Sequence, residues 1–308
     1  MSFARIIVLA ALIGVSTAPP VAPALVAEES QGSGGGRVAF GSYESGAYNV
    51  YTAAPSGAAL RLVAEDATDP VWSPDGRWLA YVAPFAALLR VRADGTRARR
   101  LAVDGRGAIY YPSWSPDSRW LSFTRMIPFI NEEGDEDGRS YIYVVRRDGR
   151  RMRRLNRSFL EPSAWSPRDG TIVFGHRLGL AAIRPDGTRF RILRRDLTMS
   201  RLSFSPSGHH LAMTASSDQG PLIRVFDMRT RRLRTLTVLK GNIAAASTIT
   251  WTPDGRRLAY LWDEYGTADG ITRKVSTGLY TIRPDGTGSV RLATLPASAG
   301  LGGLSWAP

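Results

Sequence analysis

The sequence has no cysteine among its 308 residues and only three histidines. Without cysteine the chain can form no disulfide framework, and thiol chemistry and lipid attachment through a cysteine are both excluded. The histidines are His176 and the adjacent pair His209 and His210. Because neighbouring side chains of a strand point to opposite faces, that pair cannot make a compact metal clamp, and we expect surface or capping histidines.

The common catalytic signatures are also missing. No Gly-x-Ser-x-Gly segment occurs, so a hydrolase nucleophile has no support. Gly34-Gly35-Gly36 precedes no helix pattern and is typical of a linker rather than of a phosphate-binding loop. We therefore predict no catalytic residue.

Long apolar runs are absent as well. The longest early run, 6–15, is shorter than the about 20 residues that a membrane span requires, and Pro19-Pro20 follows it. With Arg5 as the sole early charge, the pattern predicts a secretory signal peptide over 1–27 and a flexible Gly/Ser linker over 28–36. An uncleaved anchor is the alternative. The mature protein is expected to be exported, whether periplasmic, cell-wall associated or secreted, with no remaining transmembrane span.

A repeat dominates the rest of the chain. Trp72-Ser73-Pro74-Asp75-Gly76-Arg77 precedes a strand-like run, and related copies begin at Trp114, Trp165, Phe204, Trp251 and, clipped, Trp306. Their aromatic residues are 39 to 55 positions apart, close to the period of about 40–45 residues of a propeller blade. Proline closes the first strand, Asp-Gly supplies the turn, and a later Arg-x-Asp-Gly turn precedes the fourth strand. Each unit predicts four antiparallel strands.

The two ends of the repeat region complete one unit. Residues 306–308 followed by 34–40 form another copy, with Phe40 in the place of Tyr81. The C-terminal residues should supply the first strand of a blade whose other strands lie near 37–42, 48–54 and 60–64. The sequence thus predicts an all-β, six-bladed β-propeller of four-stranded blades over 37–308, closed by its C-terminal strand. An open stack of repeats is the alternative.

The Trp-Ser-Pro-Asp-Gly-Arg-x-Leu-Ala-Tyr pattern resembles the WD-like propeller repeat of the TolB family. The resemblance covers residues 34–308 and implies a six-bladed propeller with a partner-binding role. TolB proteins have an α/β domain before the propeller, and no counterpart is expected here. Related propellers that act as oligogalacturonate lyases use a histidine-rich metal site, which this sequence does not offer.

Charge is the second compositional signal. The net charge is +13, and Lys240 and Lys274 are the only lysines among 40 basic residues. The arginines cluster in the predicted fourth strands, where charge prevents edge-to-edge pairing, and arginine usage fits a GC-rich coding sequence. The alternative is an anionic partner held by a salt-sensitive field, such as an acidic wall polymer or lipid headgroups. Nucleic acid is not expected as a partner.

Strand direction places the candidate binding residues on one face. Two connections between second and third strands are long, near 127–138 and 263–274, and belong to blades that stand opposite each other. Residues three or four positions before the repeat aromatics should form a polar ring at the channel mouth. The candidates are Asp69, Tyr111, Glu161, Arg201 and Thr248 in the ring, and Glu132, Glu133, Asp135, Asp137, Asp263, Glu264 and Tyr265 in the long loops.

The acidic loop at 131–137 raises the question of a cation. Its carboxylates suit Ca²⁺, but the loop lacks the twelve-residue frame with a terminal bidentate Glu, so a solvated loop is favoured and no cofactor is predicted. The function expected is a monomeric, non-catalytic binding scaffold of the cell envelope that recognises an envelope protein or an anionic polymer. The alternative is a lyase- or lactonase-type enzyme with Asp69 and Glu161 holding a divalent metal in the channel.

Overall fold

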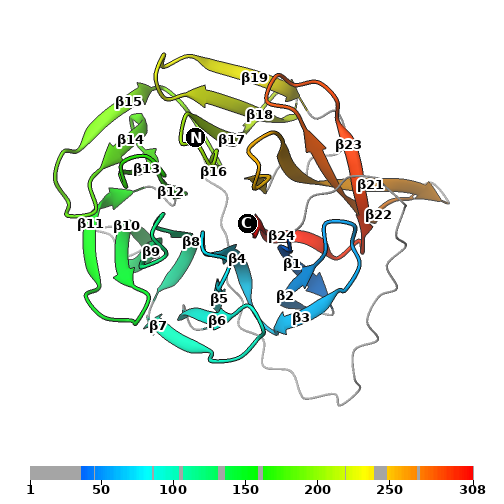
Figure 1. Ribbon diagram of the computed structural model, residues 1–308, viewed down its shortest axis with the longest axis horizontal. Coiled ribbons are helices and arrows are strands. Elements are labelled where there is room, and N and C mark those ends of the chain that lie inside the picture. Colours follow the sequence, from blue (N-terminus) through cyan, green and yellow to red (C-terminus); the bar gives the residue numbers. More distant parts are fainter. Residues whose placement is uncertain are drawn as a thin grey trace.

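The computed structural model describes residues 36–44, 46–84, 87–103, 107–130, 136–158, 162–218, 220–238, 248–268 and 271–307. The signal peptide predicted at 1–27 lies outside them. The described residues form six four-stranded antiparallel sheets arranged as blades around a central channel, with no helix among them (Figure 1). The prediction of an all-β, six-bladed propeller is confirmed.

Each blade runs from a channel strand outward to an edge strand. In that order, blade one consists of β24 (Ala299–Trp306), β1 (Val38–Glu44), β2 (Ala47–Ala53) and β3 (Arg61–Ala64). Blade two consists of β4 (Thr68–Trp72), β5 (Trp78–Ala83), β6 (Ala87–Arg92) and β7 (Arg99–Val103). Blade three consists of β8 (Ala108–Trp114), β9 (Trp120–Ile130), β10 (Glu136–Arg146) and β11 (Arg153–Ser158).

Blade four consists of β12 (Ser163–Trp165), β13 (Ile172–His176), β14 (Gly179–Ile183) and β15 (Arg191–Arg195). Blade five consists of β16 (Arg201–Phe204), β17 (His210–Ser217), β18 (Gly220–Asp227) and β19 (Leu233–Val238). Blade six consists of β20 (Ile249–Trp251), β21 (Leu258–Ala268), β22 (Ile271–Ile282) and β23 (Val290–Leu295).

Blade one joins the two ends of the propeller. β24 pairs antiparallel with β1, with Trp306 opposite Val38 and Leu304 opposite Phe40. Gly303 has φ +115°, and a Cβ at this residue would lie 3.1 Å from Asp69 Cα, so a side chain there would press β24 against blade two. The ring is therefore closed by the C-terminal strand, as the sequence predicts.

The recurring turn of each repeat is held by its own side chains. The Ser73 hydroxyl donates to Asp75 Oδ1 (2.6 Å) and accepts from the Trp78 N–H (3.0 Å). Thr252 makes the same pair of contacts in blade six, with Asp254 (2.6 Å) and the Arg257 N–H (3.1 Å). The Ser/Thr-Pro-Asp-Gly sequence thus connects the first and second strands of a blade by satisfying backbone donors that would otherwise be buried without partners.

One feature of the predicted loops is wrong. Residues 127–130 and 136–138 belong to β9 and β10, and 263–268 and 271–274 belong to β21 and β22, so both predicted loops are mostly paired strands. Backbone pairing continues through Pro128 opposite Gly138. A hairpin that extends beyond the blade has no neighbouring blade on either face, so it does not need apolar side chains on both faces. Acidic and glycine-rich composition suggested a loop, yet it is compatible with a solvated two-stranded arm.

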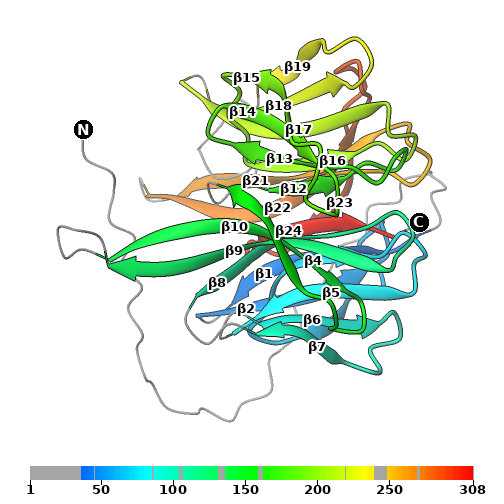
Figure 2. The ribbon, with the colours of Figure 1, turned by 90° about the vertical axis from the view of Figure 1, so that its left-hand side faces the viewer.

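These long hairpins define the two faces of the disc. Both project from the same side, β9–β10 far beyond the blades and β21–β22 less far (Figure 2), and they stand on opposite sides of the ring (Figure 1). We call this side the hairpin face. The opposite side carries the short turns between strands one and two and between strands three and four of each blade, and we call it the turn face.

Candidate binding site at the channel mouth

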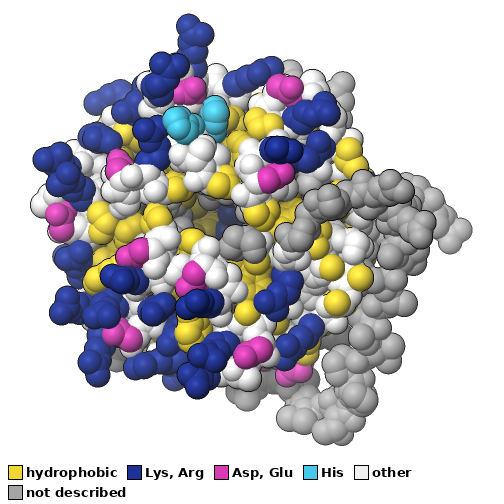
Figure 3. Space-filling model, viewed as in Figure 1, with side chains coloured by type: hydrophobic (Ala, Val, Ile, Leu, Met, Phe, Trp, Pro, Cys, Tyr) yellow, Lys and Arg dark blue, Asp and Glu magenta, His cyan; other side chains and the backbone are white. Residues whose placement is uncertain are grey.

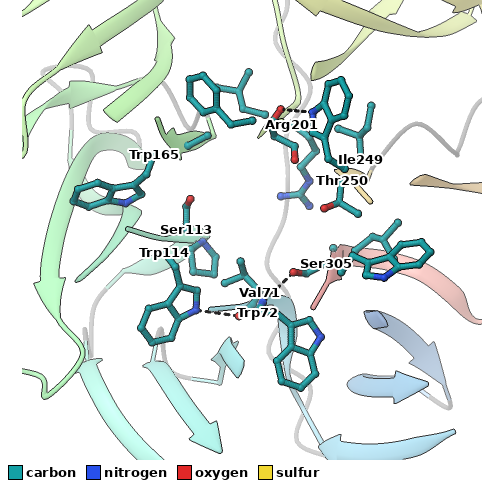
Figure 4. Close-up of a pocket in the computed structure, with 18 of the residues that line it drawn as sticks. Val71, Trp72, Ser113, Trp114, Trp165, Arg201, Ile249, Thr250 and Ser305 are labelled. Carbon is teal, nitrogen blue, oxygen red and sulfur yellow. Dashed lines mark hydrogen bonds between the residues drawn. The ribbon is translucent and has the colours of Figure 1, made fainter. Parts of the chain in front are cut away.

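The centre of the propeller is a cavity of about 480 Å³. The first strands of all six blades line it, and their side chains converge from every direction (Figure 4). Ser113, Ser203, Thr250 and Ser305 occupy the same position, one residue before the repeat aromatic, in four different blades. The wall at this level therefore offers hydroxyl groups between apolar surfaces, a composition that suits a polar ligand or chain segment.

Bulges aim two side chains at the mouth of this cavity. β4 gains one residue relative to β5 between Thr68 and Val71, and β8 gains one relative to β9 between Tyr110 and Ser113. Asp69 and Tyr111 occupy these bulges with positive φ values of 51° and 54°, each directly before a proline. Because L-residues rarely adopt this conformation, both positions are strained, and bulges of this kind redirect side chains at functional sites.

Arg201 of β16 completes the group from across the channel. Its Nη2 lies 3.1 Å from Asp69 Oδ1, and its guanidinium carbon lies 4.6 Å from the centroid of the Tyr111 ring. Blades two and five are opposite in the ring (Figure 1), so this ion pair spans the channel. Three of the residues predicted to ring the mouth are thus in mutual contact.

Burial dominates the electrostatics of this pair. Asp69 is only 9% exposed, and desolvation raises the pKa of its carboxyl above the ordinary value. The Arg201 charge and the Tyr111 N–H both favour the ionised form and oppose that effect. The carboxylate is paired with Arg201 but takes up a proton more readily than a surface aspartate.

Thr248 lines the same cavity and is buried, with no hydrogen-bond partner for its Oγ1 within the described part of the chain. An unsatisfied buried hydroxyl beside a cavity is a candidate contact for a bound group. Glu161, the fifth predicted ring residue, lies outside the described residues.

Of the candidate residues predicted in the two long loops, the structure describes the side chains of some and not of others. Asp263 is buried and accepts from Thr277 Oγ1 (3.0 Å) and Lys274 Nζ (2.7 Å), while Tyr265 is 37% exposed. Asp137 lies in β10 opposite Phe129, and Glu264 lies in β21 opposite Ser276, but their side chains are not described. Glu132, Glu133 and Asp135 lie outside the described residues.

Asp263 is therefore engaged by a cation of the protein itself. Within the described part of the chain, no group of three or more histidine, cysteine, aspartate or glutamate side chains has the arrangement needed to hold a metal ion. His176 packs edge-to-face against Phe190 with centroids 5.3 Å apart, and His210 Nε2 lies 4.0 Å from Asp227 Oδ2. Both histidines thus have local structural contacts.

The sequence did not single out three large exposed side chains on the hairpin face. Tyr43 and Tyr48, at the β1–β2 connection, are 42% and 43% exposed, and their rings lie 4.7 Å apart. Val275 in β22 is 59% exposed. Tyrosine is enriched among residues that dominate protein interfaces. In the sequence these residues have ordinary strand character, and only their exposure singles them out.

The fold and this site define a six-bladed β-propeller with an ion pair across its polar channel mouth and two long hairpins on one face. No known protein-family model and no curated protein sequence matches the chain. Among the described residues no helix is long and apolar enough to cross a membrane.

Solved structures do match, and they include TolB proteins. TolB from Acinetobacter baumannii is 18% identical, with a TM-score of 0.69 over 90% of this chain and 68% of that one. A chain of the nidogen/laminin complex is 13% identical, with a TM-score of 0.64 over 89% of this chain and 99% of that one. An oligogalacturonate lyase in complex with manganese is 17% identical, with a TM-score of 0.55 over 84% and 74%. At these identities the likeness establishes the shared fold.

Proposed function

We propose that this protein is a non-catalytic, exported scaffold of the cell envelope that binds a partner on its hairpin face. The observation that carries the proposal is the pair of long hairpins, β9–β10 and β21–β22, which rise from opposite blades on the same side of the channel (Figure 2). A partner seated over the channel would contact both arms and the mouth at once.

The chemistry of this face supports a protein partner over an anionic wall polymer. Tyr43, Tyr48, Tyr265 and Val275 are exposed large side chains of blades one and six. Aromatic groups of this kind contribute much of the energy of protein interfaces, since they bury a large area with few rotatable bonds. Asp69 and Arg201 would add polar contacts that fix orientation at the mouth.

The structural neighbours are consistent with this role. TolB proteins share the fold, and the nidogen/laminin neighbour is a similar propeller solved in a complex between proteins. The oligogalacturonate lyase neighbour is the reason to keep an enzyme as the alternative. For that alternative, Asp69 would have to exchange Arg201 for a metal ion.

Site-specific crosslinking tests the proposal. A photoreactive residue in place of Tyr265, with 37% exposure, should form an adduct with an envelope protein in cells. Val290, with 46% exposure at the turn-face start of β23, is the matched control and should form no such adduct. The double variant Tyr43→Ser/Tyr48→Ser should reduce the Tyr265 adduct at least about fivefold, since interface tyrosines each contribute about 1–2 kcal/mol.

Adducts of equal yield from both faces would contradict the proposal. Elemental analysis of the purified protein addresses the enzyme alternative separately. A stoichiometric divalent metal that is lost in Asp69→Ala would favour the enzyme, whereas a scaffold should keep its Tyr265 adduct in the same variant.

A further inference from the structure

The turn face has a chemistry of its own. In blades two to five the segments 92–100, 146–154, 184–192 and 227–234, which connect the third and fourth strands and include the first two residues of the fourth, each contain three to six arginines and a single aspartate. The corresponding segment of blade six, 283–291, contains two arginines, and that of blade one, 54–61, contains one. The basic segments therefore belong to four consecutive blades, and we call them the arginine arc.

Figure 3 shows where these basic side chains lie. Dark blue side chains follow the margin of the turn face from its lower edge, along the left side, to the top, over the outer strands of blades two to five in Figure 1. The arc is thus a continuous curved rim on a broad disc rather than one local cluster.

Four arginines of the arc adopt the left-handed, positive-φ backbone conformation that glycine adopts more readily. Arg97, Arg151, Arg189 and Arg231 have φ between 54° and 60° and are exposed. At the matching turns, blade six has Gly288 with φ 61° and blade one has Ala59 with φ 55°. Glycine takes this conformation without steric conflict and arginine does not. The turn has this conformation in all six blades, and four consecutive blades have an exposed arginine at it.

The aspartates of these turns are hydrogen-bonded to the backbone of their own turns. Asp94, Asp148 and Asp186 each accept a hydrogen bond through Oδ1 from the N–H two residues later, at 2.8, 3.0 and 2.9 Å. Those bonds lower their pKa values and keep them ionised, but they fix each carboxylate over its own turn. One aspartate per turn offsets only part of the arginine charge, and the arc keeps a net positive field.

Apolar side chains stand directly beside two of the strained arginines. Met152 follows Arg151 and is 46% exposed, and Phe190 follows Arg189 and is 43% exposed. Alternation of basic and large apolar groups along a rim is typical of surfaces that lie on a lipid bilayer, because the cations contact headgroup phosphates and the apolar groups enter the interface. A water-soluble polyanion would give those apolar groups no partner.

We propose that the arginine arc docks the propeller on a membrane leaflet rich in anionic phospholipid. Guanidinium groups bind phosphate in a bidentate manner, and a planar leaflet can meet a rim that spans four blades at once. Docking on the turn face directs the hairpin face away from the bilayer. The membrane contact and the contact proposed for the hairpins then involve opposite sides and fail independently.

Vesicle co-sedimentation of the full chain tests this inference. Vesicles contain phosphatidylcholine either alone or with about one third phosphatidylglycerol. The variant Arg97→Gly/Arg151→Gly/Arg189→Gly/Arg231→Gly removes four charges and also relieves backbone strain, so folding is preserved. Its affinity for the anionic vesicles should fall by at least about tenfold, since each basic group near such a surface contributes measurably. Arg139→Gln/Arg177→Gln, which removes two charges outside the arc, is the control for Arg151→Gly/Arg189→Gly, which removes two within it. The control should change the affinity by less than about twofold.

Two further arms identify the source of the phosphate. Met152→Ser should weaken vesicle binding at unchanged net charge, and free polyphosphate at matched phosphate concentration should compete only partly. Anionic vesicles that bind the four-glycine variant as well as the parent chain would overturn the inference. So would complete competition by polyphosphate together with no effect of the serine variant, which would assign the arc to a soluble polyanion.

Discussion

Arg201 and Asp69 form an ion pair across the channel, with 3.1 Å between Nη2 and Oδ1, although they belong to opposite blades. The Asp69 side chain is 10% exposed and that of Arg201 is 21% exposed, so the pair is largely shielded from solvent. Tyr111 lies against the same guanidinium. Three side chains from three blades are therefore in contact across the mouth.

The first prediction concerns the pH dependence of stability. Burial raises the pKa of Asp69, so between the ordinary aspartate pKa of about 4 and the raised value the folded chain holds a proton that the unfolded chain has released. This contribution to the free energy of unfolding is fully present below that window and is lost as the pH rises through it. Urea unfolding from pH 4 to 8 should show the stability of the parent chain relative to Asp69→Asn falling with pH. A relative stability that rises with pH would mean that Arg201 outweighs desolvation.

The second prediction concerns ring closure. Leu304 is 8% exposed and packs in the cluster that contains Phe40 and Val38, so Leu304→Ala should reduce the free energy of unfolding by about 2–5 kcal/mol. Val290→Ala, at a residue 46% exposed in the outer strand β23, is the control and should change it by less than about 0.5 kcal/mol. Deletion of 299–308 should abolish cooperative unfolding. A truncated chain that unfolds like the intact one would contradict the role of β24.

The repeat made the blades predictable because each copy contains the residues that form its own turns. In blade one the strands expected near 37–42, 48–54 and 60–64 are observed at 38–44, 47–53 and 61–64. Such accuracy follows from local chemistry: proline ends a ladder, and Asp-Gly closes a tight turn. The lengths of β9–β10 and β21–β22 were not predictable, since acidic and glycine-rich residues are equally compatible with a loop and with a solvated hairpin.

The site was predictable only as a set of positions. Alignment to the repeat brought Asp69, Tyr111 and Arg201 to the mouth, but the contact between blades two and five depends on the bulge that turns Asp69 inward. That bulge results from Pro70 and positive φ, which the sequence indicates weakly. Tyr43 and Tyr48 could not be singled out, because exposure depends on what neighbouring segments leave uncovered.

The third prediction concerns the hydroxyl of the repeat turn. Ser73 is fully buried, and its Oγ satisfies the Trp78 N–H and contacts Asp75. Ser73→Ala should reduce the free energy of unfolding by about 1–3 kcal/mol, because a buried donor is left without a partner. Ser73→Thr should restore most of it, as Thr252 makes the same contacts in blade six. Equal losses in both variants would indicate a packing effect rather than a hydrogen bond.

The last prediction compares two tryptophans of equivalent position. Trp114 Nε1 donates to the Val71 carbonyl of the preceding blade at 3.0 Å, whereas Trp165 Nε1 has no acceptor within the described residues. Both rings are buried, at 4% and 7% exposure, so replacement by phenylalanine removes similar volume. Trp114→Phe should therefore lower the free energy of unfolding by about 1 kcal/mol more than Trp165→Phe, since a net hydrogen bond contributes about that much. Chemical denaturation of both variants measures the difference directly. Identical losses would mean that blade-to-blade cohesion comes from ring packing alone and that the indole N–H bond adds nothing.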